Sequence, residues 1–461
     1  MNQNMTLSSQ TESFGTICVV GAGYVGLTLA VTFADVGLNV VCSEVDRDKV
    51  DRLRAGEPTF FEPGLTEKLA KVCATGNLTF SPRIPDDHSI DCYIISVGTP
   101  LDPNGNVNMA SMEAVTQEIA AHLKEGDTVI LRSTVRLGTT REVLMPVLDK
   151  VGVAYGISFC PERTVEGSAL TELHELPQVV SGNNDFAVKR ATALFSLLTP
   201  HIVQVSNVET AEMIKLTDNT LRDVMFGFGN EVAEACNAIE VSATEVIEAS
   251  RLRYKRSASL AKPGPVGGPC LEKDPHIRLE GLRKFNVDLG ISVAARRINE
   301  EQPAKVMSFL SQLIGRSWMG APSPRKIAIC GLAFKGHPET DDLRGSMVYP
   351  MIAALREHFP KAELWGFDHV VDAAGTQSLN LSVAGTIEDA FDECDLVVIA
   401  NNHKQYRSLN LQALSGHMAP NGLIYDFWAN FQATDLSLRN DVKYLALGSH
   451  TRDICFWERN S

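Results

Sequence analysis

Residues 16–46, TICVVGAGYVGLTLAVTFADVGLNVVCSEVD, decide the fold. An apolar run leads into a Gly-x-Gly-x-x-Gly turn, a stretch of helical periodicity follows, and a second apolar run begins after Gly37. This order predicts a strand, a glycine turn, a helix that stops at the glycine, and a second strand. Such a unit predicts a parallel sheet whose first turn binds a dinucleotide.

The glycine turn consists of Gly21, Gly23 and Gly26. The first two let the backbone turn and approach a pyrophosphate at the helix N-terminus, and the third lets helix and strand pack closely. Glu44 ends the second predicted strand, where its carboxylate can accept hydrogen bonds from ribose hydroxyls and would repel a 2′-phosphate. The turn therefore predicts NAD rather than NADP. The alternative is a packing turn that holds no ligand.

Composition narrows the class of protein. The formal net charge of −14 over 461 residues argues against a nucleic acid or an anionic membrane as partner. No stretch is long and apolar enough for a membrane span, and the polar start lacks a signal sequence, so we expect a cytoplasmic protein. The ten cysteines stand singly, without the spacing of zinc ligands, which predicts reduced thiols and no metal site.

The chain divides by pattern into four parts. Residues 1–14 form a polar tail that is predicted to be disordered. Strand and helix patterns alternate over 15–207, helical patterns without strand signals fill 208–320, and alternation resumes over 321–461. The sequence thus predicts an α/β protein of two Rossmann-like, doubly wound parallel-sheet domains joined by a helical central region.

A second glycine turn, GLAFKG, follows the first strand of the last part. It keeps Gly331 and Gly336 but has Ala333 in place of the middle glycine. A methyl group there hinders a dinucleotide's pyrophosphate, whereas Lys335 offers a cation to a phosphorylated ligand. We expect a different nucleotide here. The alternative is a purely structural domain with a solvated lysine.

Cys270 stands in PGPVGGPCLEKDPHI, residues 263–277. The Gly/Pro-rich part excludes a helix or a central strand, and Asp274 with Pro275 suits a helix cap and first helical residue. A thiol just before a helix N-terminus and beside Lys273 is favoured as thiolate. Most single cysteines fill cores, but such a loop is an unlikely place to bury one, so we predict a nucleophile. Asp274 is a helix cap, a general base, or both.

Other polar residues are candidates by position. Lys215 and Asn219 are one helical turn apart and could hold an oxyanion or a water, although a solvated helix face is the alternative. Thr134 and the Glu162-Arg163 pair follow predicted strands of the first sheet. There they can reach a substrate beside the nicotinamide, or serve only as turn residues.

Taken together, these residues resemble the nucleotide-sugar 6-dehydrogenase family, which includes UDP-glucose, UDP-N-acetylmannosamine and GDP-mannose dehydrogenases. The resemblance covers about residues 15–450. Its motifs, in the order that the family has them, are VVGAGYVGL, FFEPGL, SVGTP, STVRLGTT, PERTVEGSAL, KLTDNTLRDV, GGPCLEKD and GLAFKGHPETDDLRGS. It implies that C6 of a UDP-sugar is oxidised twice, from alcohol to carboxylate, with two NAD in one active site, to supply a uronic acid for surface polysaccharide.

The resemblance also implies residue roles. Cys270 would attack the C6 aldehyde, and loss of hydride from the thiohemiacetal would give a thioester that water hydrolyses. Lys215 and Asn219 would stabilise the oxyanions, and Asp274 with Thr134 would position or deprotonate the water. The implied catalytic residues are Cys270, Lys215, Asn219, Asp274, Glu162 and Thr134.

Glu162 would do acid/base or water-positioning work in the same pocket. The implied NAD site consists of Gly21, Gly23, Tyr24, Val25, Gly26, Glu44, Thr99 and Thr134. The implied substrate site consists of Glu162, Arg163, Lys215, Asn219, Gly267, Phe334, Lys335 and Arg344. The second glycine turn then belongs to a nucleotide-sugar domain, and family members are usually dimers or larger, built through the helical middle.

The sequence departs from the commoner family forms in ways that leave the sugar open. Pro269 stands where Ser, Ala or His is more usual, and Gly345 where Glu is frequent. Lys273 follows the glucose-type pattern, whereas Pro275 follows the N-acetylmannosamine-type pattern. The expected substrate is a UDP-2-acetamidohexose, such as UDP-N-acetylmannosamine, or UDP-glucose.

Two other functions compete with this one. A simple two-electron hydroxyacid or sugar-acid dehydrogenase would use Lys215 and Asn219 for acid/base work, with Cys270 as a bystander. A non-catalytic nucleotide-sugar sensor would use both Rossmann-like domains for binding alone. The combination of a nucleophile, a base and oxyanion-stabilising groups argues against the sensor.

Overall fold

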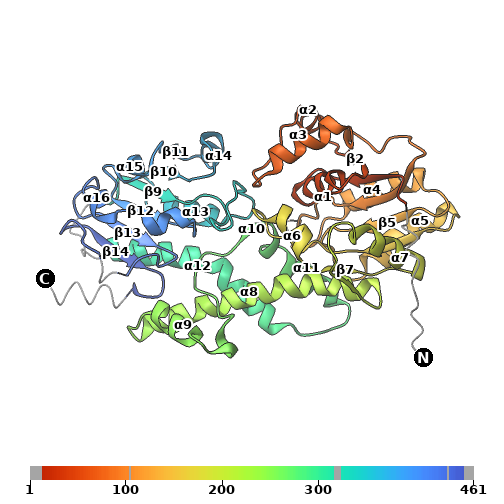
Figure 1. The fold of residues 1–461 in the computed structure, drawn as a ribbon. Coiled ribbons are helices and arrows are strands. Elements are labelled where there is room, and N and C mark those ends of the chain that lie inside the picture. The colour runs from red at the N-terminus through yellow and green to blue at the C-terminus, as the bar shows by residue number, and fades with distance from the viewer. Residues whose placement is uncertain (1–12, 103–104, 316–322, 433–435, 451–461) are drawn as a thin grey trace, which may run out of the picture. The chain divides into compact units, whose positions relative to one another are not determined.

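The chain folds into two compact units (Figure 1). The computed structural model describes residues 13–102, 105–315, 323–432 and 436–450. One unit contains the chain up to Thr217 together with His276–Asn286, and the other contains Asp218–Pro275 and the chain from Val287 onward. Most of the tail predicted over residues 1–14 lies outside the described residues.

A parallel sheet forms the centre of the first unit. Its strand order is β3-β2-β1-β4-β5-β6. The strands are β1 (Thr16–Val20), β2 (Asn39–Ser43), β3 (Leu78–Ser81), β4 (Ile90–Ile95), β5 (Thr128–Leu131) and β6 (Gly156–Phe159). The short β3 was not anticipated from its sequence. The order reverses between β1 and β4, so the carboxyl ends of these two strands border the expected ligand crevice.

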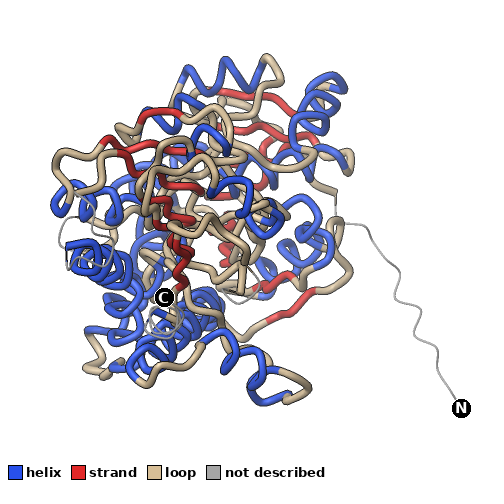
Figure 2. The backbone as a smooth tube through the Cα atoms, turned by 90° about the vertical axis from the view of Figure 1, so that its left-hand side faces the viewer, coloured by secondary structure: helices blue, strands red, loops and turns tan. Residues whose placement is uncertain are grey.

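Helices cover both faces of this sheet (Figure 2). They are α1 (Tyr24–Asp35), α2 (Arg47–Arg54), α3 (Leu65–Thr75), α4 (Ala110–His122), α5 (Met145–Leu148), α6 (Ala169–Glu175) and α7 (Asp185–Phe195). Successive β1 residues alternate between two cores: Ile17 and Val19 join one, and Cys18 and Val20 the other. Burial on both faces explains why β1 is apolar throughout.

Two short strands differ from the expectation. The apolar runs at β7 (Gln178–Val180) and β8 (Ile202–Gln204) pair with each other as a separate two-stranded parallel sheet. Residues of β8 are half-buried or exposed, whereas the strands at the centre of the main sheet are buried. Apolar character alone therefore did not identify which sheet these runs join.

The second unit has a sheet of the same order, β11-β10-β9-β12-β13-β14. The strands are β9 (Lys326–Cys330), β10 (Glu363–Phe367), β11 (Ser382–Val383), β12 (Leu396–Ile399), β13 (Leu423–Asp426) and β14 (Lys443–Ala446). Its helices are α13 (Val348–His358), α14 (Ala373–Ser378), α15 (Ile387–Phe391) and α16 (Leu411–Ser415). The prediction of two doubly wound parallel sheets is confirmed. Unlike the first glycine turn, the turn after β9 leads into a long loop, and the next helix, α13, begins at Val348.

The predicted helical region separates the two sheets along the chain. It contains α8 (Val208–Ala238), α9 (Ala243–Arg251), α10 (Gly268–Leu271), α11 (Asp274–Arg283) and α12 (Gly290–Gly315). Helix α8 begins in the first unit and ends in the second, and α11 runs from the second unit into the first. Each unit therefore contains parts of this region.

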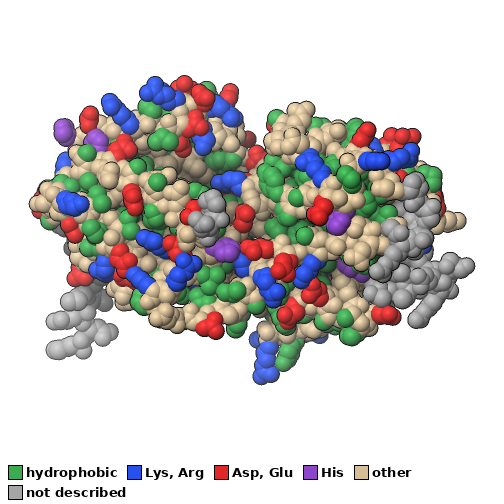
Figure 3. Space-filling model, turned by 180° about the vertical axis from the view of Figure 1, so that it is seen from behind, with side chains coloured by type: hydrophobic (Ala, Val, Ile, Leu, Met, Phe, Trp, Pro, Cys, Tyr) green, Lys and Arg blue, Asp and Glu red, His purple; other side chains and the backbone are tan. Residues whose placement is uncertain are grey.

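The distribution of charged side chains and the character of the helices are consistent with the composition. Acidic and basic side chains are interspersed on the face shown in Figure 3. Among the helices that the structure describes, none combines the length and the apolar character that crossing a membrane requires. Within the same residues, no group of three or more His, Cys, Asp or Glu side chains is placed to hold a metal ion.

Candidate active site

The first glycine turn is shaped for a dinucleotide. A Cβ on Gly26 would lie 1.9 Å from the Gly21 carbonyl oxygen and 2.3 Å from Ser96 Oγ, so this glycine lets α1 pack against the strands. A Cβ on Gly23 would meet nothing within 4 Å. Helix α1 begins directly afterwards at Tyr24, which leaves its first amides beside this space. The turn therefore fits a pyrophosphate.

Glu44 lies beside this turn. Its Oε2 accepts a hydrogen bond from the Ala22 amide at 3.1 Å, and its Oε1 accepts one from the Asp46 amide at 3.1 Å. The carboxylate thus holds the turn in shape. The role expected at the adenosine ribose stays a prediction.

The carboxyl ends of β4 and β5 bring two candidate threonines together. Thr99 Oγ1 donates to the Thr134 carbonyl oxygen at 2.6 Å, and Ser133 Oγ donates to the Val97 carbonyl oxygen at 2.7 Å. Thr99 is buried. These bonds fix the edge of the sheet at which a nicotinamide is expected.

Glu162, after β6, is a buried and fully bonded carboxylate. Arg132 donates to its Oε2 from Nε at 3.0 Å and from Nη2 at 2.6 Å, and the amides of Arg163 and Thr164 donate to its Oε1 at 2.7 and 2.8 Å. Burial acts to raise the pKa of Glu162, but Arg132, the Thr164 amide and Lys215 together hold it below its ordinary value. Glu162 is therefore ionised at neutral pH, which suits water positioning or charge stabilisation better than proton donation.

Arg132 is a site residue that sequence reasoning missed. It is 2% exposed and also donates to the carbonyl oxygen of Cys160 at 3.1 Å and to Gln178 Oε1 at 3.0 Å. The available signal was an arginine at the end of an apolar strand, since such a charge needs a buried partner.

Tyr24 and Glu62 connect two of the motifs. The Tyr24 hydroxyl donates to Glu62, and burial followed by this hydrogen bond raises the pKa of Tyr24. Glu62 also accepts from the amides of Gly167 at 2.6 Å and Ala169 at 2.7 Å. FFEPGL and PERTVEGSAL thus meet at the start of α1, which gives the Tyr24 side chain a positioning role.

Lys215 and Asn219 lie on α8 and are 7% and 6% exposed, so they do not form a solvated helix face. Asn219 Nδ2 donates to Asp274 Oδ2 at 2.5 Å, and Lys273 Nζ donates to Asp274 Oδ1 at 2.8 Å. Asp274 is fully buried at the start of α11. Both of its oxygens are therefore held, and the cluster combines an amide, a carboxylate and a cation.

Cys270 is exposed, whereas the other cysteines within the described residues are buried or half-buried. Burial raises the pKa of Cys18 and of Cys160 to about 12, which keeps these thiols protonated. One part of the expectation was wrong: Cys270 lies inside the single turn of α10, not in a loop, although α11 begins at Asp274 as predicted. Pro269 permits this turn because a proline in the first turn of a helix needs no amide partner.

Arg296, on α12, holds the Cys270 segment and was also missed. It donates from Nη1 to the Leu271 carbonyl oxygen at 2.6 Å and to Asp223 Oδ1 at 2.8 Å, and from Nη2 to the Val266 carbonyl oxygen at 3.3 Å. Arg296 and Asp223 are both buried. The arginine therefore fixes the backbone on both sides of Cys270.

The loop after β9 packs against the same segment. The Gly268 amide donates to the Gly345 carbonyl oxygen at 2.7 Å, and a Cβ on Gly268 would lie 2.3 Å from the Phe334 ring. Gly345 has φ +61°, and a Cβ there would lie 2.3 Å from a Glu272 carboxylate oxygen. This contact explains glycine at position 345, where the family frequently has Glu.

The other candidates of this loop take different positions. Lys335 Nζ lies 5.3 Å from the centroid of the Phe334 ring. Arg344, whose side chain is 65% exposed, pairs with Asp342 at 2.6 Å. Substrate contacts of both cations stay predictions.

The predicted residues thus fall into two groups, one in each unit. The first unit contains Gly21, Gly23, Tyr24, Val25, Gly26, Glu44, Thr99, Thr134, Glu162, Arg163 and Lys215. The second contains Asn219, Gly267, Cys270, Asp274, Phe334, Lys335 and Arg344. Within their units, the structure brings Glu162 close to Lys215 and Asn219 into contact with Asp274.

A dinucleotide turn of this kind is typical of dehydrogenases, and the family comparisons agree. The chain matches three domains of the UDP-glucose/GDP-mannose dehydrogenase family: the NAD binding domain over residues 15–199, the central domain over 209–301 and the UDP binding domain over 328–433. The chain belongs to this family. It is an NAD-dependent nucleotide-sugar dehydrogenase, and the predictions of family and cofactor are confirmed.

Individual relatives are consistent with this assignment. The chain is 30% identical over 407 residues to UDP-N-acetyl-D-mannosamine dehydrogenase of Pyrococcus horikoshii, which covers 87% of this chain and 93% of that protein. Over 414 residues it is 30% identical to the enzyme of the same name from Escherichia coli K12, covering 86% and 96%.

Solved structures agree with these relatives. UDP-D-ManNAc dehydrogenase from P. horikoshii has a TM-score of 0.82 at 28% identity, with 95% of this chain and 100% of that chain covered. A UDP-glucose dehydrogenase from Pyrobaculum islandicum also has a TM-score of 0.82, at 25% identity, with 96% and 99% covered.

Proposed function

We propose that this protein oxidises C6 of a UDP-2-acetamidohexose, such as UDP-N-acetylmannosamine, to the uronic acid through a thioester on Cys270. The observation that carries the proposal is the exposed Cys270 thiol on a backbone fixed by Arg296, in the same unit as the buried Asn219–Asp274 pair. The names of the relatives favour the acetamido sugar. UDP-glucose is the second candidate, because a UDP-glucose dehydrogenase structure is equally similar by TM-score.

The proposed reaction has two oxidations and one hydrolysis. NAD, when bound at the first glycine turn, accepts a hydride from C6. In the first oxidation the hydroxyl group loses its proton and C6 loses a hydride, which gives the aldehyde. Cys270 Sγ then bonds to C6 as a thiohemiacetal, whose loss of a proton and a second hydride gives the thioester. Water adds and Sγ leaves as thiolate, so one alcohol, two NAD and one water yield one carboxylate, two NADH and three protons.

The buried polar residues support each step. Lys215 and Asn219 would stabilise the oxyanions that form at C6, because a cation and an amide donor are stronger partners in a buried site than in water. Asp274, bonded by Asn219 and Lys273, would position the hydrolytic water. The ionised Glu162 would stabilise the charge of Lys215.

The decisive experiment counts NADH per sugar. The purified protein is incubated with NAD and, separately, with UDP-glucose, UDP-galactose and the UDP derivatives of N-acetylglucosamine, N-acetylmannosamine and N-acetylgalactosamine. We expect two NADH per UDP-N-acetylmannosamine. The overall rate of Cys270→Ser should fall at least about a thousandfold, since a serine hydroxyl is a poorer nucleophile than a cysteine thiolate. Cys73→Ser is the matched control at a half-buried cysteine.

Each alternative predicts another result. One NADH with an accumulating aldehyde would contradict the thioester route. Near-normal activity of Cys270→Ser would favour the two-electron dehydrogenase. Two NADH from UDP-glucose alone would assign the second candidate, and no turnover of any UDP-sugar would direct the same assay to GDP-sugars and then to the sensor hypothesis.

We also propose a homodimer or a larger homo-oligomer built through the helical region, in a cytoplasmic protein. Large apolar side chains are exposed on α8 and α12: Leu221 is 57%, Phe228 54%, Ile291 75% and Val293 50% exposed. Size-exclusion chromatography with light scattering measures the mass of the oligomer directly. Phe228→Glu should shift it toward that of one chain, whereas an unchanged mass would place the contact elsewhere.

A further inference from the structure

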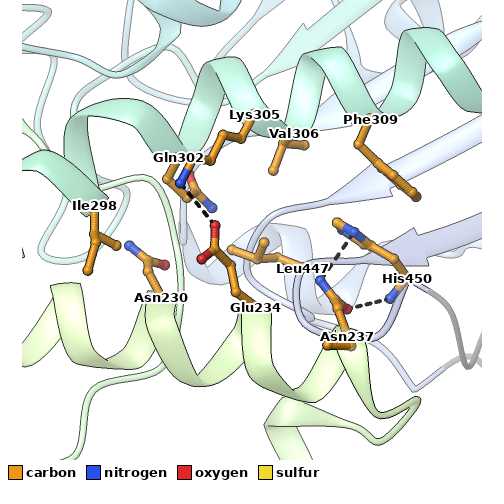
Figure 4. Close-up of a pocket in the computed structure, with 11 residues that line it drawn as sticks. Asn230, Glu234, Asn237, Ile298, Gln302, Lys305, Val306, Phe309, Leu447 and His450 are labelled. Atoms are coloured by element: carbon orange, nitrogen blue, oxygen red, sulfur yellow. Dashed lines mark hydrogen bonds and ion pairs between the residues drawn. The ribbon is translucent and has the colours of Figure 1, made fainter.

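A cavity of about 360 Å³ lies between α8 and α12, and Leu447 and His450 close one side (Figure 4). Gln302 lines it and is 7% exposed. Among the residues that the structure describes, none offers a hydrogen-bond partner to Gln302 Nε2 or Oε1. Leaving both polar atoms of a buried carboxamide without partners is costly, so this side chain calls for a ligand.

The ionic groups around the cavity are already paired. Lys305 Nζ lies 3.1 Å from Glu234 Oε1 and 3.3 Å from Glu301 Oε2. Asn237 and His450 share two hydrogen bonds, at 3.0 and 3.3 Å. The carboxylates of Glu234 and Glu301 beside Lys305 repel a negative charge, which disfavours anions such as phosphates. The cavity therefore suits an uncharged molecule.

The walls of the cavity are partly apolar. Phe309, which stacks on His450 with ring centroids 4.2 Å apart, adds aromatic surface, and Ile298 and Val306 add aliphatic surface from α12. A carboxamide offers one acceptor oxygen and one NH₂ donor side by side. Its complement is a molecule whose N–H and C=O lie on the same edge, as in a lactam.

Asn230 connects the cavity to the active-site segment. It lines the cavity, while its Nδ2 donates to the Gly264 carbonyl oxygen at 3.1 Å and its Oδ1 accepts from the Gly264 amide at 2.9 Å. Asn230 Nδ2 also donates to Asn299 Oδ1 at 2.9 Å. Gly264 is the second residue of the Gly/Pro-rich stretch that leads to Cys270. A ligand beside Asn230 therefore lies next to the bonds that hold this stretch.

We propose that this cavity binds a small, uncharged lactam through Gln302, and that binding changes the reactivity of Cys270 through Asn230. The lining residues differ from those of the dinucleotide turn and of the predicted substrate site. The proposal assigns a regulatory function to the C-terminal part of α8 and the middle of α12.

Binding is tested with 2-pyridone, which has one lactam edge, against N-methyl-2-pyridone, which has lost the N–H. The full chain is kept saturated with NAD and UDP so that the established nucleotide sites are filled, and ligand-observed NMR titration measures affinity. We expect saturable binding of 2-pyridone and at least tenfold weaker binding of its N-methyl form. Absence of saturable binding, or equal binding of the two compounds, would overturn the proposal.

Variants locate the site. Gln302→Met keeps the length of the side chain and removes the amide, and Val306→Phe fills the cavity while keeping Gln302. Each should weaken 2-pyridone binding at least tenfold, whereas the exposed Gln312→Met on the same helix should leave it unchanged. Wild-type affinity in both cavity variants, with their melting temperatures intact, would overturn the location.

The link to Cys270 has its own readout. The rate at which iodoacetamide alkylates Cys270 is followed by mass spectrometry with and without saturating 2-pyridone. We expect at least a twofold change in the wild-type protein and none in Gln302→Met. An unchanged rate in the wild-type protein, at a concentration that saturates the cavity, would overturn the coupling through Asn230.

Discussion

The two sheets have the same strand order, but the turns after their first strands do different work. At Gly23 an added Cβ would meet nothing within 4 Å, and α1 begins at once. After β9, Phe334 instead packs against Gly268 of the Cys270 segment, and no helix begins before Val348. The first turn leaves its space to a cofactor, and the loop that follows the second turn supports the segment that carries Cys270.

One device is common to both turns. An acidic residue after the second strand binds the backbone of the turn: Glu44 accepts from the Ala22 amide at 3.1 Å, and Asp368 accepts from the Leu332 amide at 2.6 Å. The two sheets therefore share the strand order and the acidic residue that binds the turn. They differ in whether the space beside the turn is open or is filled by the protein. Function follows the site more closely than the fold.

We expect the largest loss of stability from a substitution that removes the hydrogen bonds holding the Cys270 segment. Arg296→Met leaves the buried Asp223 carboxylate without its arginine, which costs roughly 3–5 kcal/mol of unfolding free energy. Trp365 and Trp428 lie in the second unit, and the sequence has no tryptophan in the residues of the first unit, so urea unfolding followed by tryptophan fluorescence measures the second unit.

The control for that variant is another arginine of the second unit. Arg344 also pairs with an aspartate, but its side chain is 65% exposed, so Arg344→Met should cost less than about 1 kcal/mol. Equal losses in the two variants would mean that Arg296 does not anchor the segment.

The second prediction fills the space at the first turn. Gly23→Val should weaken NADH binding by about a hundredfold, equivalent to roughly 2.7 kcal/mol, because the side chain occupies the place of the pyrophosphate. Folding should be little affected, since Gly23 has φ −74° and open space around it. Fluorescence titration with NADH measures the affinity.

The matched change at the second turn is Ala333→Gly. It restores the middle glycine of the motif, yet NADH affinity should stay at the wild-type value because we assign the cofactor to the first turn alone. Tighter or additional NADH binding by this variant would show that the two turns differ by one methyl group only.

Local patterns predicted the parts of the site that depend on nearby residues. The strand, turn and helix around Gly23 could be predicted because apolar periodicity and glycine spacing act over neighbouring positions. Cys270 could be singled out because Gly and Pro exclude regular structure around it, although Pro269 permitted the turn of α10. The roles of Arg296 and Asn230 could not be predicted from the sequence, because their hydrogen-bond partners come from distant parts of the chain.

The third prediction concerns how the stability of the second unit depends on pH. Burial lowers the pKa of His450 to about 4, whereas the unfolded residue titrates near its ordinary value of about 6.5. The stabilisation is complete above about pH 6.5 and is lost as the pH falls toward 4, because the unfolded chain then binds the proton more readily. At pH 5 the second unit should have lost about 2 kcal/mol relative to pH 7.

His450→Gln is the control for this pH effect. Tryptophan-detected unfolding of the variant at both pH values should lack the loss assigned to His450. In the first unit the lowered pKa of Glu162 keeps its stabilising charge until the pH falls below the usual carboxylate range. An identical pH profile of variant and wild type would assign the acid sensitivity to other groups.

The smallest effect compares one substitution at the two kinds of glycine. Gly345→Ala should cost about 1–2 kcal/mol in the tryptophan-detected transition, because φ is +61° and the new Cβ would press on Gly268 and Glu272. Gly23→Ala should cost almost no stability, since its φ of −74° suits any residue. The second variant should instead lose NADH affinity. Equal losses of stability in Gly345→Ala and Gly23→Ala would mean that the protein packs as closely around Gly23 as around Gly345. The distinction between an open cofactor turn and a supporting loop would then fail.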